Sequence, residues 1–128
     1  MWRVALYAQE IPGRRGRARL EQQAARLAIS VARRPGWWHV ATFADQSWGG
    51  GWRPGLSGLL AAAPGHYDVV AVDTNSRLSP DRHERGVVLA HLQAAGVATV
   101  VLGPSAARRL VTLAADLALV DLIDGATR

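Results

Sequence analysis

The sequence of 128 residues predicts an α/β fold, a mostly parallel sheet of four or five strands with helices on both faces. Three observations predict it. Short apolar runs rich in β-branched residues alternate with longer amphipathic segments. Two of these runs are apolar at nearly every position, which is typical of strands covered on both faces. The strand–helix order, repeated three times before a fourth strand, favours parallel pairing with right-handed crossovers.

Four strands are expected, over residues 3–8, 38–43, 67–72 and 97–102. The first is a short apolar run that ends before Pro12, and the second alternates β-branched and aromatic residues. The last two are the valine-rich runs, so we expect them at the centre of the sheet.

The helix after the first strand shows helical spacing of its apolar residues, at Leu20, Ala24, Leu27, Ala28 and Val31. Pro35 and Gly36 end this amphipathic segment. Residues 54–63 predict a short second helix that Pro64 ends.

The third helix has clear end signals in the sequence. Ser79 is its expected N-cap, Pro80 takes the first helical position and Asp81 supplies an acid to the first turn. Gly96 is expected to end the helix.

The last segment, from a Ser105 cap to about Asp124, predicts a helix that forms an interface. Its apolar stripe consists of Leu110, Leu113, Leu117 and Val120, while Leu119, Leu122 and Ile123 fall outside the stripe. One face cannot bury all of these side chains, so a homodimer or heterodimer interface is expected here, which includes Ile123. The alternative is a frayed C-terminal strand.

We expect a single domain over residues 1–128, with an α/β core at 1–103, an interface helix at 104–124 and no C-terminal DNA-binding domain. No apolar run is long enough to span a bilayer, and no signal-peptide core precedes the first strand, so a soluble cytoplasmic protein is expected. The chain has no cysteine, and its four histidines lack metal-ligand spacing. Neither a metal nor a cofactor is therefore expected.

All fifteen basic residues are arginine, and they give the chain a net charge of +5. Such a charge suits a polyanionic partner. A genome whose codon bias favours arginine would give the same net charge without any selection for DNA binding. One glycine-flanked cluster stands out, consisting of Arg14, Arg15, Arg17 and Arg19. It predicts a flexible basic loop and candidate phosphate or DNA contacts.

In open α/β sheets the functional crevice lies beyond the carboxyl ends of the strands. The motifs around these ends are Arg3-Val-Ala-Leu-Tyr7, Leu20-Glu-Gln-Gln23, Phe43-Ala-Asp45, Arg53-Pro-Gly-Leu56, Tyr67-Asp-Val-Val70 and Arg77-Leu-Ser79. This ordered set covers nearly the whole chain and resembles the N-terminal catalytic domain of the serine recombinase (resolvase/invertase) family. The resemblance implies a three-layer resolvase-like fold with a C-terminal dimerisation helix. It also implies a serine that attacks a DNA phosphodiester while arginines stabilise the phosphoryl charge.

The sequence departs from the family at the residues that carry this chemistry. The family's first strand leads into tyrosine, any residue, arginine, valine and the nucleophilic serine, whereas this chain has Gln9 for the arginine and Ile11 for the serine. In the family's Asp-Arg-Leu-Ser-Arg run, Ser76 replaces the acid and Pro80 the second arginine. Loss of one electrostatic stabiliser costs about 10²–10³ in rate, so strand cleavage is expected to be absent.

Five positions keep the residue that the resemblance implies for the site: Tyr7, Gln23, Asp45, Arg53 and Arg77, with Gln22 as the alternative to Gln23. Other hydroxyls near the crevice are Ser47, Thr74, Ser76 and Ser79. A replacement nucleophile would also need an adjacent base and oriented stabilisers, so we do not expect one.

The five tryptophans fall into two groups. Trp2, Trp37 and Trp38 are expected to pack against the sheet. Trp48 and Trp52 lie in a glycine-rich loop, where they either bind a partner or a base, or are buried beneath the loop.

These observations leave two main functions. One is a pseudoenzyme that acts as a protein-interaction or regulatory module through dimerisation. The other is a DNA-handling resolvase domain in site-specific recombination, with weak non-specific DNA contact through the arginine cluster. The missing nucleophile favours the first. A phosphate or nucleotide site at Arg53, Arg77 and the loop amides ranks lowest, because no glycine-rich phosphate loop is present.

Overall fold

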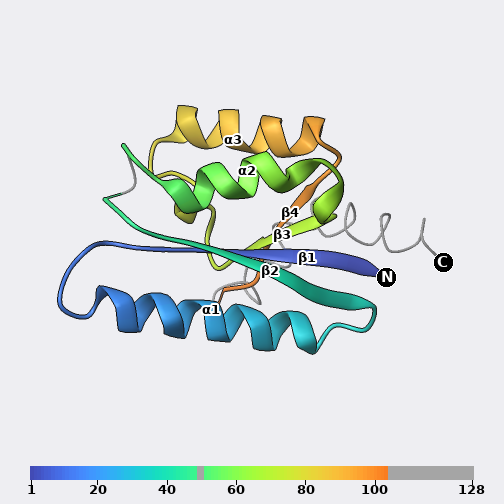
Figure 1. The fold of residues 1–128 in the computed structure, drawn as a ribbon, viewed down its shortest axis with the longest axis horizontal. Helices are drawn as coiled ribbons and strands as arrows, with labels where there is room; N and C mark the ends of the chain where they lie inside the picture. The colour runs from blue at the N-terminus through green and yellow to red at the C-terminus, as the bar shows by residue number, and fades with distance from the viewer. Residues whose placement is uncertain (49–50, 104–128) are drawn as a thin grey trace.

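The computed structural model describes residues 1–48 and 51–103. Its strands are β1 (Trp2–Glu10), β2 (Trp37–Gln46), β3 (Val69–Val72) and β4 (Ala98–Val101). They pair in parallel in the order β2-β1-β3-β4. The helices are α1 (Gly16–Ala32), α2 (Pro54–His66) and α3 (Arg82–Ala94), and a short 3-10 turn, η1 (Asn75–Arg77), precedes α3. The predicted α/β class and strand–helix order are confirmed (Figure 1).

Helices cover both faces of the sheet, as Figure 1 shows, with α1 on one side and α2 and α3 on the other. Side chains of β1 alternate between the two layers, as expected for a strand. Val4 and Leu6 pack with Leu27 of α1, whereas Tyr7 packs with Leu59 of α2 and the α3 side of the core. β1 is buried on both faces, as expected for a central strand. The polar residues at its end therefore lie at the middle of the carboxyl edge of the sheet.

The place of β4 in the sheet differs from the prediction. It pairs only with β3 and forms an edge of the described sheet, whereas β1 and β3 are central. Three of its four residues are partly exposed, and Val100 is buried. A valine-rich run does not distinguish a central strand from an edge strand, because one covered face is enough to select apolar residues.

The helix ends agree with the sequence in two cases and differ at the start of α3. The regular helical backbone of α2 stops at Pro64 and Gly65, the latter at φ +85°, and Gly96, at φ +79°, follows the C-cap of α3, as predicted. The N-cap of α3 is Asp81, whose carboxylate accepts from the amides of His83 and Glu84, and not Ser79. Acid and serine both cap helices well, so the sequence could not choose between them.

The basic segment is also different from the flexible loop that was predicted. α1 begins at Gly16, with Arg15 as its N-cap, and therefore contains Arg17 and Arg19. Glycine at this point does not break the helix, because Gly16 lies where the first turn passes close to the backbone of Ile11. Arg14 and Arg15 belong to the turn after β1.

The three tryptophans predicted to pack against the sheet do not all do so. Trp37 is buried and Trp2 packs at the edge of the α1 layer, but Trp38 is 57% exposed. Side chains alternate along β2, so Trp38 lies on the opposite face from Trp37, which packs in the α1 layer.

The expected interface helix lies outside the described residues, together with the side chains assigned to it, Leu110, Leu113, Leu117, Val120 and Ile123. No helix of the described ranges is both long and apolar enough to cross a bilayer. Within the same ranges, no three His, Asp or Glu side chains are grouped as metal ligands would be.

Candidate functional site

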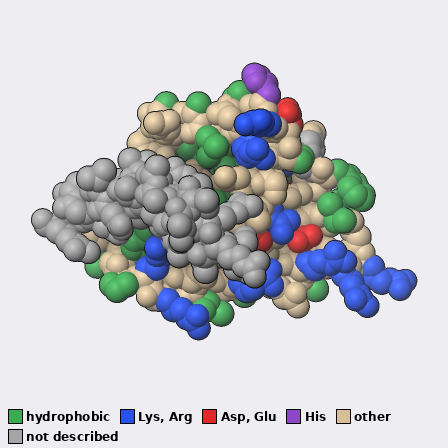
Figure 2. Space-filling view, turned by 180° about the vertical axis from the view of Figure 1, so that it is seen from behind, with side chains coloured by type: hydrophobic (Ala, Val, Ile, Leu, Met, Phe, Trp, Pro, Cys, Tyr) green, Lys and Arg blue, Asp and Glu red, His purple; other side chains and the backbone are tan. Residues whose placement is uncertain are grey.

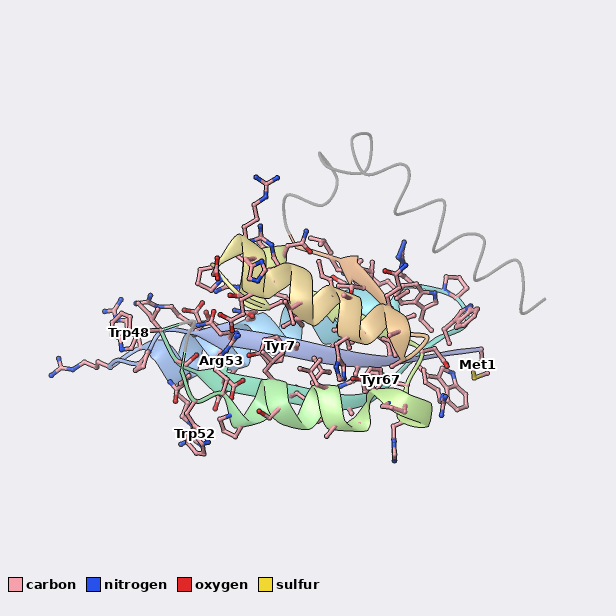
Figure 3. The ribbon with its side chains drawn as sticks, turned by 90° about the horizontal axis from the view of Figure 1, so that it is seen from above. Met1, Tyr7, Trp48, Trp52, Arg53 and Tyr67 are labelled. Carbon is pink, nitrogen blue, oxygen red and sulfur yellow. The ribbon has the colours of Figure 1, made fainter. Side chains whose placement is uncertain are left out.

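The predicted site residues that lie within the described chain meet at the carboxyl edge of the sheet, where β1 and β2 end and the helices begin. Figure 3 shows Tyr7 pointing toward this end and Arg53 at it, with Trp48 and Trp52 beyond them and Met1 at the opposite end. The strand order brings β1 between β2 and β3, so side chains from all three strand ends and from α1 converge here. This is the location expected for a crevice in a parallel sheet.

Asp45, at the end of β2, anchors the beginning of α2. Its carboxylate accepts hydrogen bonds from the Tyr7 hydroxyl at 2.6 Å, the Gly55 amide at 2.7 Å and the Leu56 amide at 2.8 Å. Gly55 must lack a side chain, because a Cβ atom there would collide with the carbonyl oxygen of Ala44. Burial and then the hydrogen bond to Asp45 raise the pKa of Tyr7 well above its usual value, so the phenol stays protonated and donates.

Arg53, the residue before α2, is buried and bound by groups of its own chain. Its Nη1 donates to the carbonyl oxygen of Leu78 at 2.7 Å, and its Nη2 donates to Oε1 of Glu84 at 2.9 Å. The Arg53 side chain is only 3% exposed, whereas that of Glu84 is 46% exposed. Arg53 therefore ties the start of α2 to the segment that leads into α3.

Arg77, at the end of η1, is held by two carboxylates and a backbone carbonyl. Nε and Nη2 donate to the two oxygens of Asp73 at 2.8 and 3.2 Å, in a bidentate pair, while Nη1 donates to the carbonyl oxygen of Gln9 at 2.9 Å. Nη1 also lies 3.5 Å from Oε1 of Glu10. Burial alone would lower the Arg77 pKa, but the hydrogen bond and charge of Asp73 and the charge of Glu10 raise it.

Gln23 of α1 fixes the end of β1. This residue is fully buried, and its Oε1 accepts from the Gln9 amide at 2.9 Å while its Nε2 donates to the Gln9 carbonyl at 3.1 Å. The same Nε2 lies 3.4 Å from Oε1 of Glu10. Gln22, the alternative candidate, is exposed, so it is Gln23 that reaches the site.

The positions that depart from the family pattern differ in their burial and contacts. Gln9 turns toward β2, where its Nε2 donates to the Ser47 carbonyl at 2.6 Å. Ile11 is 44% exposed just beyond the end of β1. Ser76 and Pro80 are both exposed, on either side of Arg77.

The other hydroxyls near the site serve local structure. The Ser76 and Thr74 hydroxyls lie 2.7 Å apart. Ser79 is fully buried, and its Oγ accepts from the Asp81 amide at 3.1 Å, which shapes the turn before the cap of α3.

Three acids at this edge, Glu10, Asp73 and Glu84, were missed by the sequence analysis. Glu10 ends an otherwise buried strand, and Asp73 directly follows β3, four residues before Arg77. A carboxylate at the end of an apolar run and an Asp–Arg pair at this spacing were the available signals. With Asp45 and Glu84, the site has four carboxylates around two arginines, so it carries no excess of positive charge.

The end of β4 lies directly beside Asp73. The Leu102 amide donates to the Val72 carbonyl at 2.8 Å, and the chain then passes so close to Asp73 that a Cβ atom on Gly103 would collide with the Asp73 carbonyl oxygen. Only glycine allows this approach.

The arginine cluster is separate from these buried contacts. Arg14, Arg15, Arg17 and Arg19 are all exposed, and only Arg17 has an ion pair, 3.4 Å from Glu21, within residues 1–48 and 51–103. Trp48 and Trp52 are 73% and 86% exposed, so of the two alternatives left open by the sequence, burial beneath the loop is wrong. The glycine-rich sequence between them supplies no apolar side chains to cover them.

No family model matches the sequence, and the comparison with curated proteins finds no match. Solved structures do match. The C-terminal catalytic domain of ISC1926 TnpA, an IS607-like serine recombinase, is 24% identical with a TM-score of 0.71 over 80% of this chain and 69% of that one. The N-terminal catalytic domain of TP901-1 integrase is 19% identical with a TM-score of 0.67 over 98% and 99%.

A third match is a resolvase family site-specific recombinase from Streptococcus pneumoniae, 15% identical with a TM-score of 0.63 over 97% of this chain and 90% of that one. At these identities the similarity concerns the arrangement of the backbone and not the chemistry of the site. The chain has the resolvase-like fold of serine recombinase catalytic domains.

Proposed function

We propose that the chain is a catalytically inactive serine-recombinase-like domain that acts as a protein-interaction or regulatory module. Two features support this proposal: the position that the resemblance assigns to the nucleophile is Ile11, and both Arg53 and Arg77 donate to acceptors of the same chain. An aliphatic side chain cannot form a phosphoester. Covalent strand cleavage therefore has no starting group at this position.

The electrostatics support the same conclusion. A phosphoryl group in transfer needs arginines that are free to donate to its oxygens. Here a phosphate would have to displace Asp73 from Arg77 and Glu84 from Arg53, which are charge-assisted hydrogen bonds within the fold. It would also approach Glu10, whose carboxylate repels it.

The residues that the resemblance assigns to the site also hold parts of the fold together, which supports the proposal. Asp45 anchors α2, Arg53 joins α2 to α3, and Gln23 joins α1 to β1. A domain that keeps its fold after losing its reaction can still act as a binding surface. The apolar pattern over residues 104–124 is the sequence feature that favours dimerisation.

The proposal is tested by mixing the purified chain with duplex DNA fragments from its genome and separating denatured products by size. We expect no covalent protein–DNA adduct. Sedimentation over a range of concentrations, on the same protein, is expected to show a dimer. A covalent adduct would overturn the assignment of inactivity, and a mass that stays monomeric at every concentration would overturn self-association.

A matched variant makes the first result interpretable. Ile11→Ser restores a hydroxyl at an exposed position without disturbing the core. We expect it to remain inactive, because Gln9 and Pro80 still lack the guanidinium groups of the family pattern. Cleavage by Ile11→Ser alone would show that the remaining arginines are available to DNA, contrary to the proposal.

A further inference from the structure

We infer that Trp48, Trp52, Arg14 and Arg15 form a binding surface for single-stranded nucleic acid, with unpaired bases stacked on the tryptophans and phosphates held by the arginines. We call it the tryptophan–arginine surface. It lies at the carboxyl edge but uses none of the buried contacts around Arg53 and Arg77. The inference therefore does not depend on whether the site is inactive.

The two tryptophans are the most exposed aromatic side chains of the described residues, at 73% and 86%. Large aromatic groups left in water lose the stabilisation that burial would give, so folding does not explain their position. They lie four positions apart on either side of a glycine-rich stretch. Their Cα atoms can be at most roughly 14 Å apart, a separation that one short strand of nucleotides can bridge.

The arginines lie at a position where they destabilise the helix that follows them. α1 has no side-chain cap and no acid in its first turn, and Arg15 is its N-cap. The positive end of a helix favours anions and disfavours cations, so arginines here cost stability. Neither Arg14 nor Arg15 has an ion pair or a side-chain hydrogen bond to any part of the chain that the structure describes. An external anion supplies the missing partner.

Strand pairing places Trp48 beside the turn that carries the arginines. Glu10 pairs with Gln46, and the Ser47 amide donates to the Glu10 carbonyl at 2.9 Å. The turn that carries Arg14 and the residue Trp48 therefore leave the sheet from neighbouring positions. In Figure 2 hydrophobic side chains gather directly above a group of basic ones at the right of the molecule.

The acidic groups nearby do not cancel this charge. Glu10 is turned inward toward Arg77, with a side chain that is 15% exposed. Glu21 is exposed but pairs with Arg17, which leaves Arg14, Arg15 and Arg19 as the excess charge at the start of α1. The surface is thus basic and aromatic together.

This combination favours a single strand over the other polyanions. A duplex offers phosphates to the arginines, but its base faces are already stacked on one another, so the tryptophans would have no partner. An acidic peptide would satisfy the charge without needing two flat rings. Unpaired nucleotides use both chemistries, and every base has a face that can stack.

The test measures binding of a fluorescently labelled thymidine oligonucleotide and of a uridine oligonucleotide of equal length, by anisotropy with the full chain. We expect Trp48→Ala and Trp52→Ala each to weaken binding about tenfold. Arg14→Gln with Arg15→Gln should weaken it further and reduce the slope of log affinity against log salt by about 1.4. The two oligonucleotides show whether DNA or RNA is preferred, and binding of either supports the inference.

Matched controls come from exposed residues of the same types elsewhere. Trp38→Ala, on β2, and Arg26→Gln, on α1, should bind as the unmodified chain does. Equal affinity for a duplex of the same length, displacement by poly-glutamate as readily as by oligonucleotide, unchanged binding by Trp48→Ala/Trp52→Ala, or no binding at all would each overturn the inference.

Discussion

Two sets of arginines lie at the same edge of the sheet and have opposite surroundings. Arg53 and Arg77 are partly or wholly buried, and carboxylates and carbonyls of the chain accept their hydrogen bonds. Arg14 and Arg15 are exposed and have no such partners among the described residues. The number of arginines at this edge therefore does not indicate how many of them are available to bind an anion. The family-like positions hold the internally neutralised pair, whereas the available charge lies on the other set.

The largest expected difference between the two sets is in stability. Arg53→Ala leaves the Leu78 carbonyl and the Glu84 carboxylate without their donor, which should lower the free energy of unfolding by about 2–4 kcal/mol. The lower part of this range allows for water reaching the half-exposed Glu84. Urea denaturation measures the change, with Arg14→Ala as the matched surface variant. If both variants lose the same stability, the contrast between the sets is wrong.

The second prediction concerns the network around Arg77. Arg77→Gln should cost about 1–2 kcal/mol, because one bidentate pair and one bond to the Gln9 carbonyl are lost. A double-mutant cycle with Glu10→Gln should give a smaller coupling of about 0.5 kcal/mol, since the Nη1–Oε1 contact is long and partly exposed. Zero coupling would remove Glu10 from the network while leaving the Asp73 pair intact.

The third prediction uses a third arginine, which is exposed yet paired. At the opposite edge of the sheet, Arg3 and Asp68 form an ion pair at 3.1 Å, and the Arg3 amide also donates to Asp68 at 2.9 Å. Burial alone would raise the Asp68 pKa, but the hydrogen bonds and charge of Arg3 lower it below the ordinary 3.8. A lowered folded-state pKa stabilises the fold above the unfolded-state value and loses this effect as the pH falls through the folded value.

The difference in the midpoint of thermal unfolding between the unmodified chain and Asp68→Asn should therefore be full at neutral pH and shrink as the pH falls through the folded-state pKa of Asp68. Asp68→Asn keeps the size of the side chain, so the comparison isolates its charge. A difference that persists unchanged in acid would mean that packing, and not the ion pair, is responsible.

The smallest effect is expected for the exposed set. Replacing Arg14, Arg15 and Arg19 by glutamine should leave the free energy of unfolding within about 0.5 kcal/mol, with a slight gain because cations at a helix N-terminus are unfavourable. Chemical denaturation measures this, and oligonucleotide binding should fall in the same protein. Marked destabilisation would show that these side chains have a folding role that their exposure does not reveal.

Local patterns explain how much could be predicted from the sequence. Helical spacing around Leu27, the turn at Gly96 and the apolar runs need only neighbouring residues, and these elements are confirmed. Partners that lie far apart in the chain were not predictable in this way. Glu84 is 31 residues from Arg53, and Glu10 meets Arg77 across 67 positions, so no spacing rule connects them. The edge position of β4 was not predictable for the same reason, because it depends on the order in which strands far apart in the chain pair.

The sequence indicated which residues lie at the site better than it indicated what their side chains do there. Tyr7, Gln23, Asp45, Arg53 and Arg77 do converge, as the resemblance implied. What the sequence could not give is the direction of each hydrogen bond, and therefore that Asp45 holds a helix and that Arg77 is already neutralised. The exposure of Trp48 and Trp52 was equally open, because a glycine-rich segment is compatible with either outcome.

The close approach of Gly103 to Asp73 makes the identity of residue 103 a constraint on the ion pairs at the sheet edge. Any side chain at position 103 would collide with the Asp73 carbonyl oxygen, and Asp73 is the residue whose carboxylate pairs with Arg77. A substitution at Gly103 would therefore have to shift the backbone of Asp73 or the end of β4, and with it the carboxylate that holds Arg77.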